Sequence, residues 1–117
     1  MSGPKVPYQR GAITKKKPQR ESSIEAHLVL RVHSIGGVCL KFVSPGRSGV
    51  PDRIVILPGG EVIWAELKAP GGKVSPVQAR MHKRLRDLTQ EVKVFWSTSQ
   101  IDRFFPIEQE DPLDAGG

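Results

Sequence analysis

The stretch GVPDRIVILPGGEVIWAELK, residues 49–68, decides the fold. Two runs rich in β-branched and apolar residues, 52–57 and 61–68, lie on either side of the turn sequence Pro58-Gly59-Gly60, and this pattern predicts a β-hairpin. A loop rich in glycine, proline and serine, residues 44–51, precedes the hairpin. Asp52 therefore opens the first hairpin strand, directly after a bend that leaves this end of the strand exposed.

Helices and further strands are predicted on both sides of the hairpin. Apolar residues at helical spacing follow Ser22 and stop at Gly36-Gly37, and Ser75 with Pro76 is typical of a helix start. The predicted elements are a helix at 22–35, strands at 38–43, 52–57 and 61–68, a helix at 76–88, a strand at 92–96 and a short helix at 101–105 capped by Ser99. The order α-β-β-β-α-β, with this possible last helix, indicates the α/β (α+β) class.

Each long predicted helix has an apolar face, which we expect to pack on the sheet. The two faces consist of Ile24, Leu28, Val32 and Ile35 in the first helix, and of Val77, Met81, Leu85 and Leu88 in the second.

The charge is distributed unevenly along the chain. The 117 residues have a net charge of +6, so a polyanion is the first partner to consider. Residues 1–21 form a predicted flexible basic arm and residues 108–117 a predicted disordered acidic tail, while 22–107 form the predicted folded domain. A single cysteine, Cys39, excludes an internal disulfide and favours an intracellular setting. No run is long and apolar enough for a membrane span, so no membrane association is expected.

Three side chains of the hairpin are expected to converge. Glu66 and Lys68 are two residues apart on one strand and project from the same face, and Asp52 lies at the adjoining end of the partner strand. Two carboxylates in one pocket favour a divalent cation such as Mg²⁺ or Mn²⁺, with the backbone carbonyl of Leu67 as a further ligand. A neighbouring ammonium, that of Lys68, suits stabilisation of an attacking hydroxide. An ordinary cross-strand ion pair without any chemistry is the alternative interpretation.

The set Glu25, Gly49-Val50-Pro51-Asp52, Glu66-Leu67-Lys68 and Gln78 resembles the PD-(D/E)xK nuclease superfamily. Its spacing is similar to that of the virus-type replication-repair nuclease (VRR-NUC) branch, in the small stand-alone viral and bacterial form. The resemblance covers about residues 22–96. It implies a restriction-endonuclease-like core, in which a mixed sheet is flanked by helices.

The resemblance also implies roles for single residues. Asp52 and Glu66 would hold the metal, Lys68 would assist the water, Glu25 would support the metal site or a second metal, and Gln78 would lie close by. Glu25 has a competing interpretation, because its spacing from Ser22 is that of a capping box. Gln78, in the first turn of its helix, could equally be solvated. Trp64 shares the face of Glu66, where it would pack in the core or stack on a splayed base.

Basic residues near these motifs are the predicted DNA contacts. Arg47 and Arg53 flank the proposed site and Lys73 follows it, so these three are expected to bind phosphates, whereas Lys83 and Arg84 are better placed for contacts farther along the backbone. No base-reading helix is recognisable, which favours recognition of DNA shape.

The sequence thus predicts a metal-dependent, structure-specific DNA endonuclease, a Holliday-junction resolvase acting on branched DNA as a homodimer in a bacterial or virus-infected cell. The dimer is inferred from the family and from symmetry, with the apolar residues of 22–35 or 101–105 as candidate interfaces. The alternatives are a nuclease that trims flaps or ends, and a non-catalytic basic module that binds nucleic acid.

Overall fold

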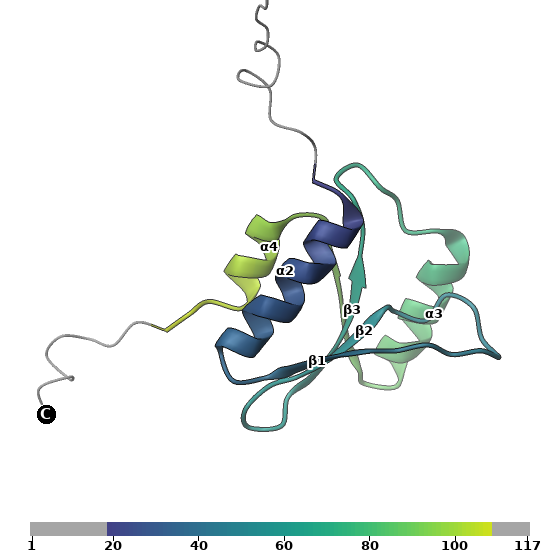
Figure 1. Ribbon diagram of the computed structural model, residues 1–117. Coiled ribbons are helices and arrows are strands. Elements are labelled where there is room, and N and C mark those ends of the chain that lie inside the picture. The colour runs from purple at the N-terminus through teal and green to yellow at the C-terminus, as the bar shows by residue number, and fades with distance from the viewer. Residues whose placement is uncertain (1–18, 109–117) are drawn as a thin grey trace, which may run out of the picture.

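A computed structural model describes residues 19–108 of the chain. Its elements are α2 (Glu21–Ser34), β1 (Val38–Lys41), β2 (Arg53–Ile56), β3 (Val62–Leu67), α3 (Pro76–Asp87), β4 (Glu91–Phe95) and α4 (Thr98–Phe104) (Figure 1). The predicted order of elements is confirmed, including the last helix. The first strand is shorter than predicted, although the Phe42 amide still donates to the Asp52 carbonyl at 2.9 Å.

The four strands form one mixed sheet in the order β1-β2-β3-β4. The β1–β2 and β2–β3 pairs are antiparallel, and the second of these is the predicted hairpin. β4 pairs with β3 in parallel, which requires the chain to cross over between them through α3. This topology places β3, the strand of Glu66 and Lys68, in the interior of the sheet.

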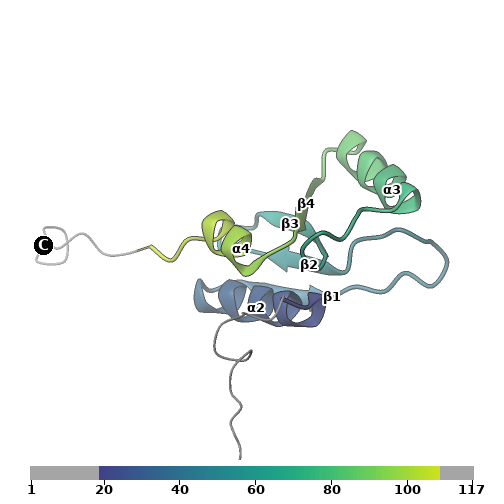
Figure 2. The ribbon, with the colours of Figure 1, turned by 90° about the horizontal axis from the view of Figure 1, so that it is seen from above.

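Helices cover the two faces of the sheet unequally. α2 and α4 lie together on one face, and α3 lies on the other (Figure 2). The main core forms on the α2 side, because alternate residues of β3 point toward that helix. It consists of Ile24, Leu28, Val32, Val55, Ile63, Ala65, Leu67, Phe95, Ile101 and Phe105. The apolar stripe predicted for the first helix is confirmed at its three buried positions, while Ile35 caps the helix and packs at the core's margin.

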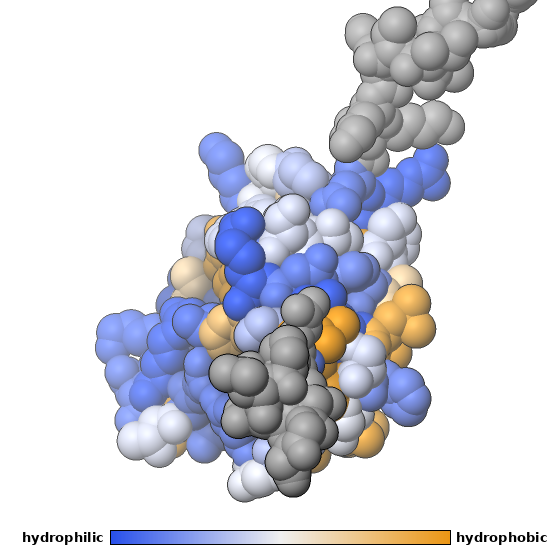
Figure 3. All heavy atoms as spheres, turned by 90° about the vertical axis from the view of Figure 1, so that its left-hand side faces the viewer, coloured by the Kyte–Doolittle hydropathy of each residue, from blue (hydrophilic) through white to orange (hydrophobic). Residues whose placement is uncertain are grey.

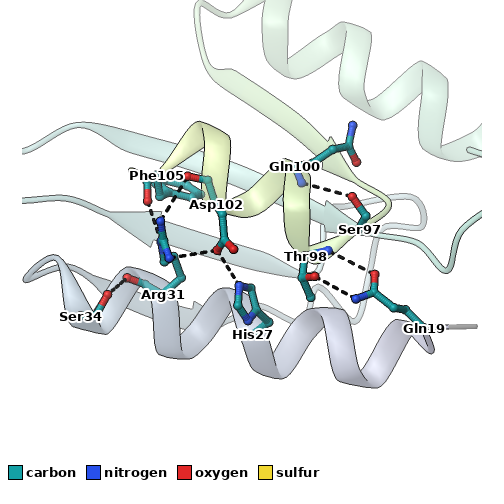
Figure 4. A network of polar contacts seen from close by, with 9 residues as sticks. All are labelled: Gln19, His27, Arg31, Ser34, Ser97, Thr98, Gln100, Asp102 and Phe105. Atoms are coloured by element: carbon teal, nitrogen blue, oxygen red, sulfur yellow. Dashed lines mark hydrogen bonds and ion pairs between the residues drawn. The ribbon is translucent and has the colours of Figure 1, made fainter. Parts of the chain in front are cut away.

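Polar contacts fasten α4 to α2 (Figure 4). Asp102 Oδ1 lies 2.6 Å from His27 Nε2 and 3.2 Å from Arg31 Nη1, and Arg31 Nε donates to the Phe105 carbonyl at 2.8 Å. Gln19 reaches the start of α4 through two bonds with Thr98, of 2.8 and 3.3 Å. The folded unit therefore includes residues 19–21, which the sequence assigned to the basic arm. The rest of that arm, and the acidic tail after residue 108, lie outside the described residues.

Two expectations about the helices are wrong. Ser97, not Ser99, caps α4 and accepts from the Gln100 amide at 3.1 Å. In α3 the buried residue is His82, whereas Val77 and Leu88 of the predicted stripe are 41% and 56% exposed. The reason is the buried Glu66 on the facing strand. A buried carboxylate needs polar partners, so α3 turns a polar face toward the sheet.

The sheet face on the α3 side remains partly uncovered. The strand register aligns two apolar rows across β1, β2 and β3 on this face, and α3 packs near β4 at the other edge. The rows are Val38, Ile56 and Val62, and Leu40, Ile54 and Trp64. Val38 and Leu40 are about half exposed, at 49% and 51%. By contrast, the side of the molecule that lies to the left in Figure 1 is mostly hydrophilic, with apolar side chains in small groups (Figure 3).

None of the described helices has the length and apolar character needed to cross a bilayer.

Candidate active site

Asp52, Glu66 and Lys68 converge as the hairpin predicts. The Leu67 amide donates to Asp52 Oδ2 at 3.2 Å, which ties the start of β2 to the end of β3. Lys68 Nζ lies 3.8 Å from Glu66 Oε2. Glu66 is 2% exposed, so one carboxylate of the set is buried in the protein while Asp52 is only partly covered.

Gln78 joins this cluster from α3. Its Nε2 donates to Glu66 Oε2 at 2.9 Å. The backbone amide and Oε1 of Gln78 also cap the helix together with Ser75. The Gln78 amide donates to Ser75 Oγ at 3.1 Å, and the Ser75 amide donates to Gln78 Oε1 at 2.9 Å. The capping box fixes the side chain in the orientation that reaches the sheet. The expected proximity is confirmed, and the solvated alternative is wrong.

The charge of Glu66 is unfavourable in its surroundings. Burial, followed by the nearby Asp52 carboxylate, raises the pKa of Glu66 to about 8, against a smaller lowering by Lys68. Glu66 Oε1 is buried and accepts no hydrogen bond. Two carboxylates in this situation need a shared proton or a cation, and hard oxygen donors of this kind suit Mg²⁺ or Mn²⁺. The residues present therefore fit a divalent cation.

The donor set is small. The described residues include no group of three or more His, Cys, Asp and Glu side chains arranged around a metal position. Two carboxylates would thus be complemented by the predicted Leu67 carbonyl and by water, as Mg²⁺ usually retains several water ligands.

The loop before Asp52 is docked on α3 through Gly49. This residue has a φ of +81°, and a Cβ atom there would lie 2.6 Å from the Val77 carbonyl oxygen. Only glycine tolerates both the conformation and the approach. Because Val77 precedes Gln78, the same contact sets the loop that carries Asp52 against the helix that carries Gln78.

Glu25 has a different partner from either predicted one. The cap of α2 is Arg20 and involves no side-chain bond, so the capping box with Ser22 is wrong. Glu25 Oε2 instead accepts from Arg53 Nε at 2.8 Å, with Lys41 Nζ at 3.9 Å. Arg53 also donates to the Cys39 carbonyl at 3.3 Å and its side chain is only 17% exposed. The Arg53 guanidinium is thus engaged inside the protein by Glu25 and the Cys39 carbonyl, which leaves it poorly placed for the phosphate contact predicted for it.

A polar cavity of about 340 Å³ opens beside Asp52. Glu25 and Arg47 contribute to its wall, as does Glu21, which the sequence analysis placed in the basic arm. The four-residue spacing of Glu21 and Glu25 could have indicated this position, because it puts both residues on one face of a helix. The helix begins one residue earlier than predicted, at Glu21. The negative charge of Glu21 also contributes to the raised pKa of Glu66. Glu21 is thus an additional acidic residue of the site.

The remaining predicted DNA contacts are exposed side chains. Lys73 lies in the loop between β3 and α3, and Lys83 forms an exposed ion pair of 2.9 Å with Asp87. Arg47 and Arg84 border a second cavity of about 300 Å³, together with Phe42, Trp64 and the apolar side of α3. Trp64 makes an edge-to-face contact with Phe42 there, so it lies in an open groove and not in the closed core. Arg80, which the sequence analysis did not select, lies with Arg47 and Arg84 along a neighbouring hollow.

Comparison with known proteins relates the chain to nucleases. No model of a protein family matches it. A phage protein named "Putative nuclease p44", from Acyrthosiphon pisum secondary endosymbiont phage 1, is 59% identical over 75 residues, which span 64% of this chain and 81% of the phage protein. A solved structure described as "VRR_NUC domain" is 35% identical with a TM-score of 0.68, and the match covers 72% of this chain and 91% of that one. Each match spans more than half of this chain and more than four fifths of the other protein.

The loop contact predicts that glycine is required at position 49. Gly49→Ala should lower the melting temperature by ~4 °C or more, because the new Cβ meets backbone and the positive φ becomes strained. Gly46→Ala is the matched control, since an added Cβ there meets nothing within 4 Å. Thermal denaturation of both variants tests the prediction. Equal melting temperatures would contradict the proposed docking of the loop on α3.

The raised pKa of Glu66 predicts a pH-dependent stability of the metal-free protein. The pKa of this carboxyl group is 4.5 in the unfolded chain and about 8 in the folded protein. Between these two pH values the folded state therefore holds a proton that the unfolded chain has released. This stabilising contribution is complete below about pH 4.5 and is lost as the pH rises through about 8. Between about pH 5 and about pH 9, the melting temperature of wild type should fall by ~4 °C or more relative to that of Glu66→Gln. At the high pH, added Mn²⁺ should raise the melting temperature of wild type but not that of Glu66→Gln. Melting temperatures that change in parallel with pH in the two proteins would contradict the raised pKa of Glu66.

Proposed function

Because the chain belongs to the VRR-NUC family of nucleases, we propose that it is a metal-dependent DNA endonuclease whose active site is formed by Asp52, Glu66 and Lys68. The observation that carries the proposal is the buried Glu66 carboxylate, placed next to Asp52 with one oxygen free. A surface ion pair would leave both carboxylates solvated and would not raise the pKa of Glu66. A site that accepts a cation explains why this carboxylate is buried beside another acid.

In this proposal each residue has a defined part in phosphodiester hydrolysis. Asp52 and Glu66, with the Leu67 carbonyl, would hold Mg²⁺ or Mn²⁺. When bound, the ion supplies Lewis-acid chemistry that polarises the phosphate and makes water more acidic. The Lys68 ammonium, with a side chain 16% exposed and 3.8 Å from Glu66, steadies the negative charge of the attacking water oxygen. The attacking water gives up a proton to the solvent as its oxygen forms the new bond to phosphorus, and the bond to the leaving sugar oxygen breaks as that oxygen takes up a proton from the solvent, so that one water is added across the phosphodiester.

Glu25 and Gln78 support the site by holding other residues. Glu25 binds Arg53, the residue next to Asp52, and thereby fixes the start of β2 against α2. Gln78 holds one oxygen of Glu66. Glu21 and Glu25 line the cavity beside Asp52, where either carboxylate is available to a second metal or its water ligands.

DNA would approach across the exposed basic residues around this cavity. Arg47 lines both the cavity of Asp52 and the groove of Arg84. Lys73, Lys83 and Arg84 extend the positive surface along the loop before α3 and the helix itself. Contacts of this kind attach the phosphate backbone without reading base sequence.

Substitutions at the site test whether the protein is an enzyme. Asp52→Asn should abolish Mg²⁺- or Mn²⁺-dependent nicking of DNA, and Lys68→Ala should slow it by ~10²–10³-fold, because each removes charge that acts in the transition state. Arg103→Ala, an exposed change on α4, serves as the control for lost positive charge. Single-turnover cleavage of labelled DNA, with binding measured in parallel, gives the readout. Retained cleavage in Asp52→Asn would exclude this site, and binding without cleavage in wild type would identify a non-catalytic module.

We further infer that two copies associate through the uncovered sheet face to act on four-way junctions. Several of the residues that the sequence suggested for an interface are buried, among them Ile24, Ile101 and Phe105, although Leu30 on α2 is 68% exposed. On β1, however, Val38 and Leu40 are 49% and 51% exposed and continue into apolar rows on the adjoining strands. Apolar patches of this kind mark association surfaces, and a two-fold dimer would present two sites to the two strands that a resolvase must cut.

Disruption of this face should separate association from chemistry. Leu40→Glu is expected to give a monomer by light scattering, and to convert paired cutting of a cruciform plasmid into single nicks. Leu30→Glu, at a position of α2 with 68% exposure, makes the same change on the alternative interface that the sequence suggested and should behave as wild type. A dimer that survives Leu40→Glu would contradict the proposed interface. Preferred cleavage of flap or linear substrates by wild type would instead identify an end-processing nuclease.

A further inference from the structure

His82 occupies an unusual place in α3. It is 2% exposed and is the residue of this helix that is buried. Gln78 lies four positions earlier, so the two side chains project from the same face of the helix, one turn apart. Both therefore face the strand that carries Glu66, and Gln78 already donates to one oxygen of that carboxylate.

The two oxygens of Glu66 differ in their partners. Oε2 accepts from Gln78, whereas Oε1 has no hydrogen-bond partner, and its neighbour at 3.8 Å is His82 Nε2. Within residues 19–108, these two atoms are the buried side-chain nitrogen or oxygen atoms that lack a partner. A separation of 3.8 Å is longer than a hydrogen bond, which spans about 2.7–3.2 Å. The two unpaired atoms thus face each other just outside bonding distance.

An apolar residue at position 82 would avoid this situation. Leaving a buried polar atom unpaired destabilises the folded state, and a leucine or methionine of similar size would pack on the sheet without that penalty. The imidazole is consequently a poor choice for packing alone. It is a suitable choice if Nε2 acquires its partner when the site is in use.

We propose that His82 is a positioning residue for the metal-binding carboxylate: its Nε2–H donates to Glu66 Oε1 in the cation-bound site, so that Gln78 and His82 hold the carboxylate from α3 by both oxygens. This inference rests on the proposed function, since it assigns an outer contact to a carboxylate that would ligate the cation. The capping box at the start of α3 and the burial of His82 fix both donors before the cation arrives. Contacts of this outer kind typically change metal affinity by ~10–100-fold when they are removed.

Titration calorimetry with Mn²⁺ alone tests the proposal without any measurement of cleavage. His82→Leu, which removes the donor but keeps an apolar packing residue, should bind Mn²⁺ ~10–100-fold more weakly than wild type. Its metal-free melting temperature should be equal to or above that of wild type, because the unpaired nitrogen is gone. His82→Gln retains an N–H donor and should recover most of the affinity. His33→Leu, the same change at an exposed position of α2, should bind as wild type does.

Each other result has a defined meaning. Wild-type affinity in His82→Leu would overturn the proposal, and so would equal losses in His82→Leu and His82→Gln, because the donor would then be irrelevant. Should His82→Leu fail to fold, His82→Met replaces it in the comparison, and failure of both to fold would show a packing role and also overturn the proposal. Absence of Mn²⁺ binding in wild type would contradict the metal site itself, which distinguishes that failure from the failure of this inference.

Discussion

The burial of one carboxylate, Glu66, is the constraint on which the remaining structure depends. A charged group with 2% exposure is stable only with partners, and the elements around β3 supply them. Gln78 comes from α3, Lys68 from the end of the same strand, and Asp52 from the loop before β2. The polar face that α3 turns to the sheet follows from this arrangement, since Gln78 and His82 face the carboxylate.

The hairpin and the convergence of its charged residues were predictable from the sequence, because alternation along a strand and the geometry of a short turn are local properties. The side of α3 that packs on the sheet could not be predicted in this way. Its apolar stripe, with Val77 and Leu88, is the conventional buried face, and the choice of His82 instead depends on a carboxylate on another strand. Local spacing in α2 likewise predicted a cap for Glu25, whereas its actual partner, Arg53, lies 28 residues away and becomes visible only when β2 is placed against α2.

The two faces of the sheet serve different purposes. On the α2 side, a closed apolar core and the contacts of Asp102 with His27 and Arg31 stabilise the fold. On the α3 side, cover is incomplete, and the exposed surface comprises the groove of Phe42 and Trp64 and the apolar rows of β1 and β2, while the polar cavity beside Asp52 takes part of its wall from α2. The candidate contacts with other molecules thus lie mainly on the face that the helices of the domain leave open.

The parallel pairing of β3 with β4 affects the order in which the protein acquires its function. The antiparallel hairpin of β2 and β3 joins neighbouring segments and can form early. The backbone amide of Lys68, by contrast, donates to the Phe95 carbonyl only after the chain has returned through α3. During synthesis on the ribosome, Gln78 and β4 emerge after Asp52 and Glu66. A nascent chain therefore has the acidic residues of the proposed site before it has the support that arranges them, and this support is complete only once translation has passed the fourth strand.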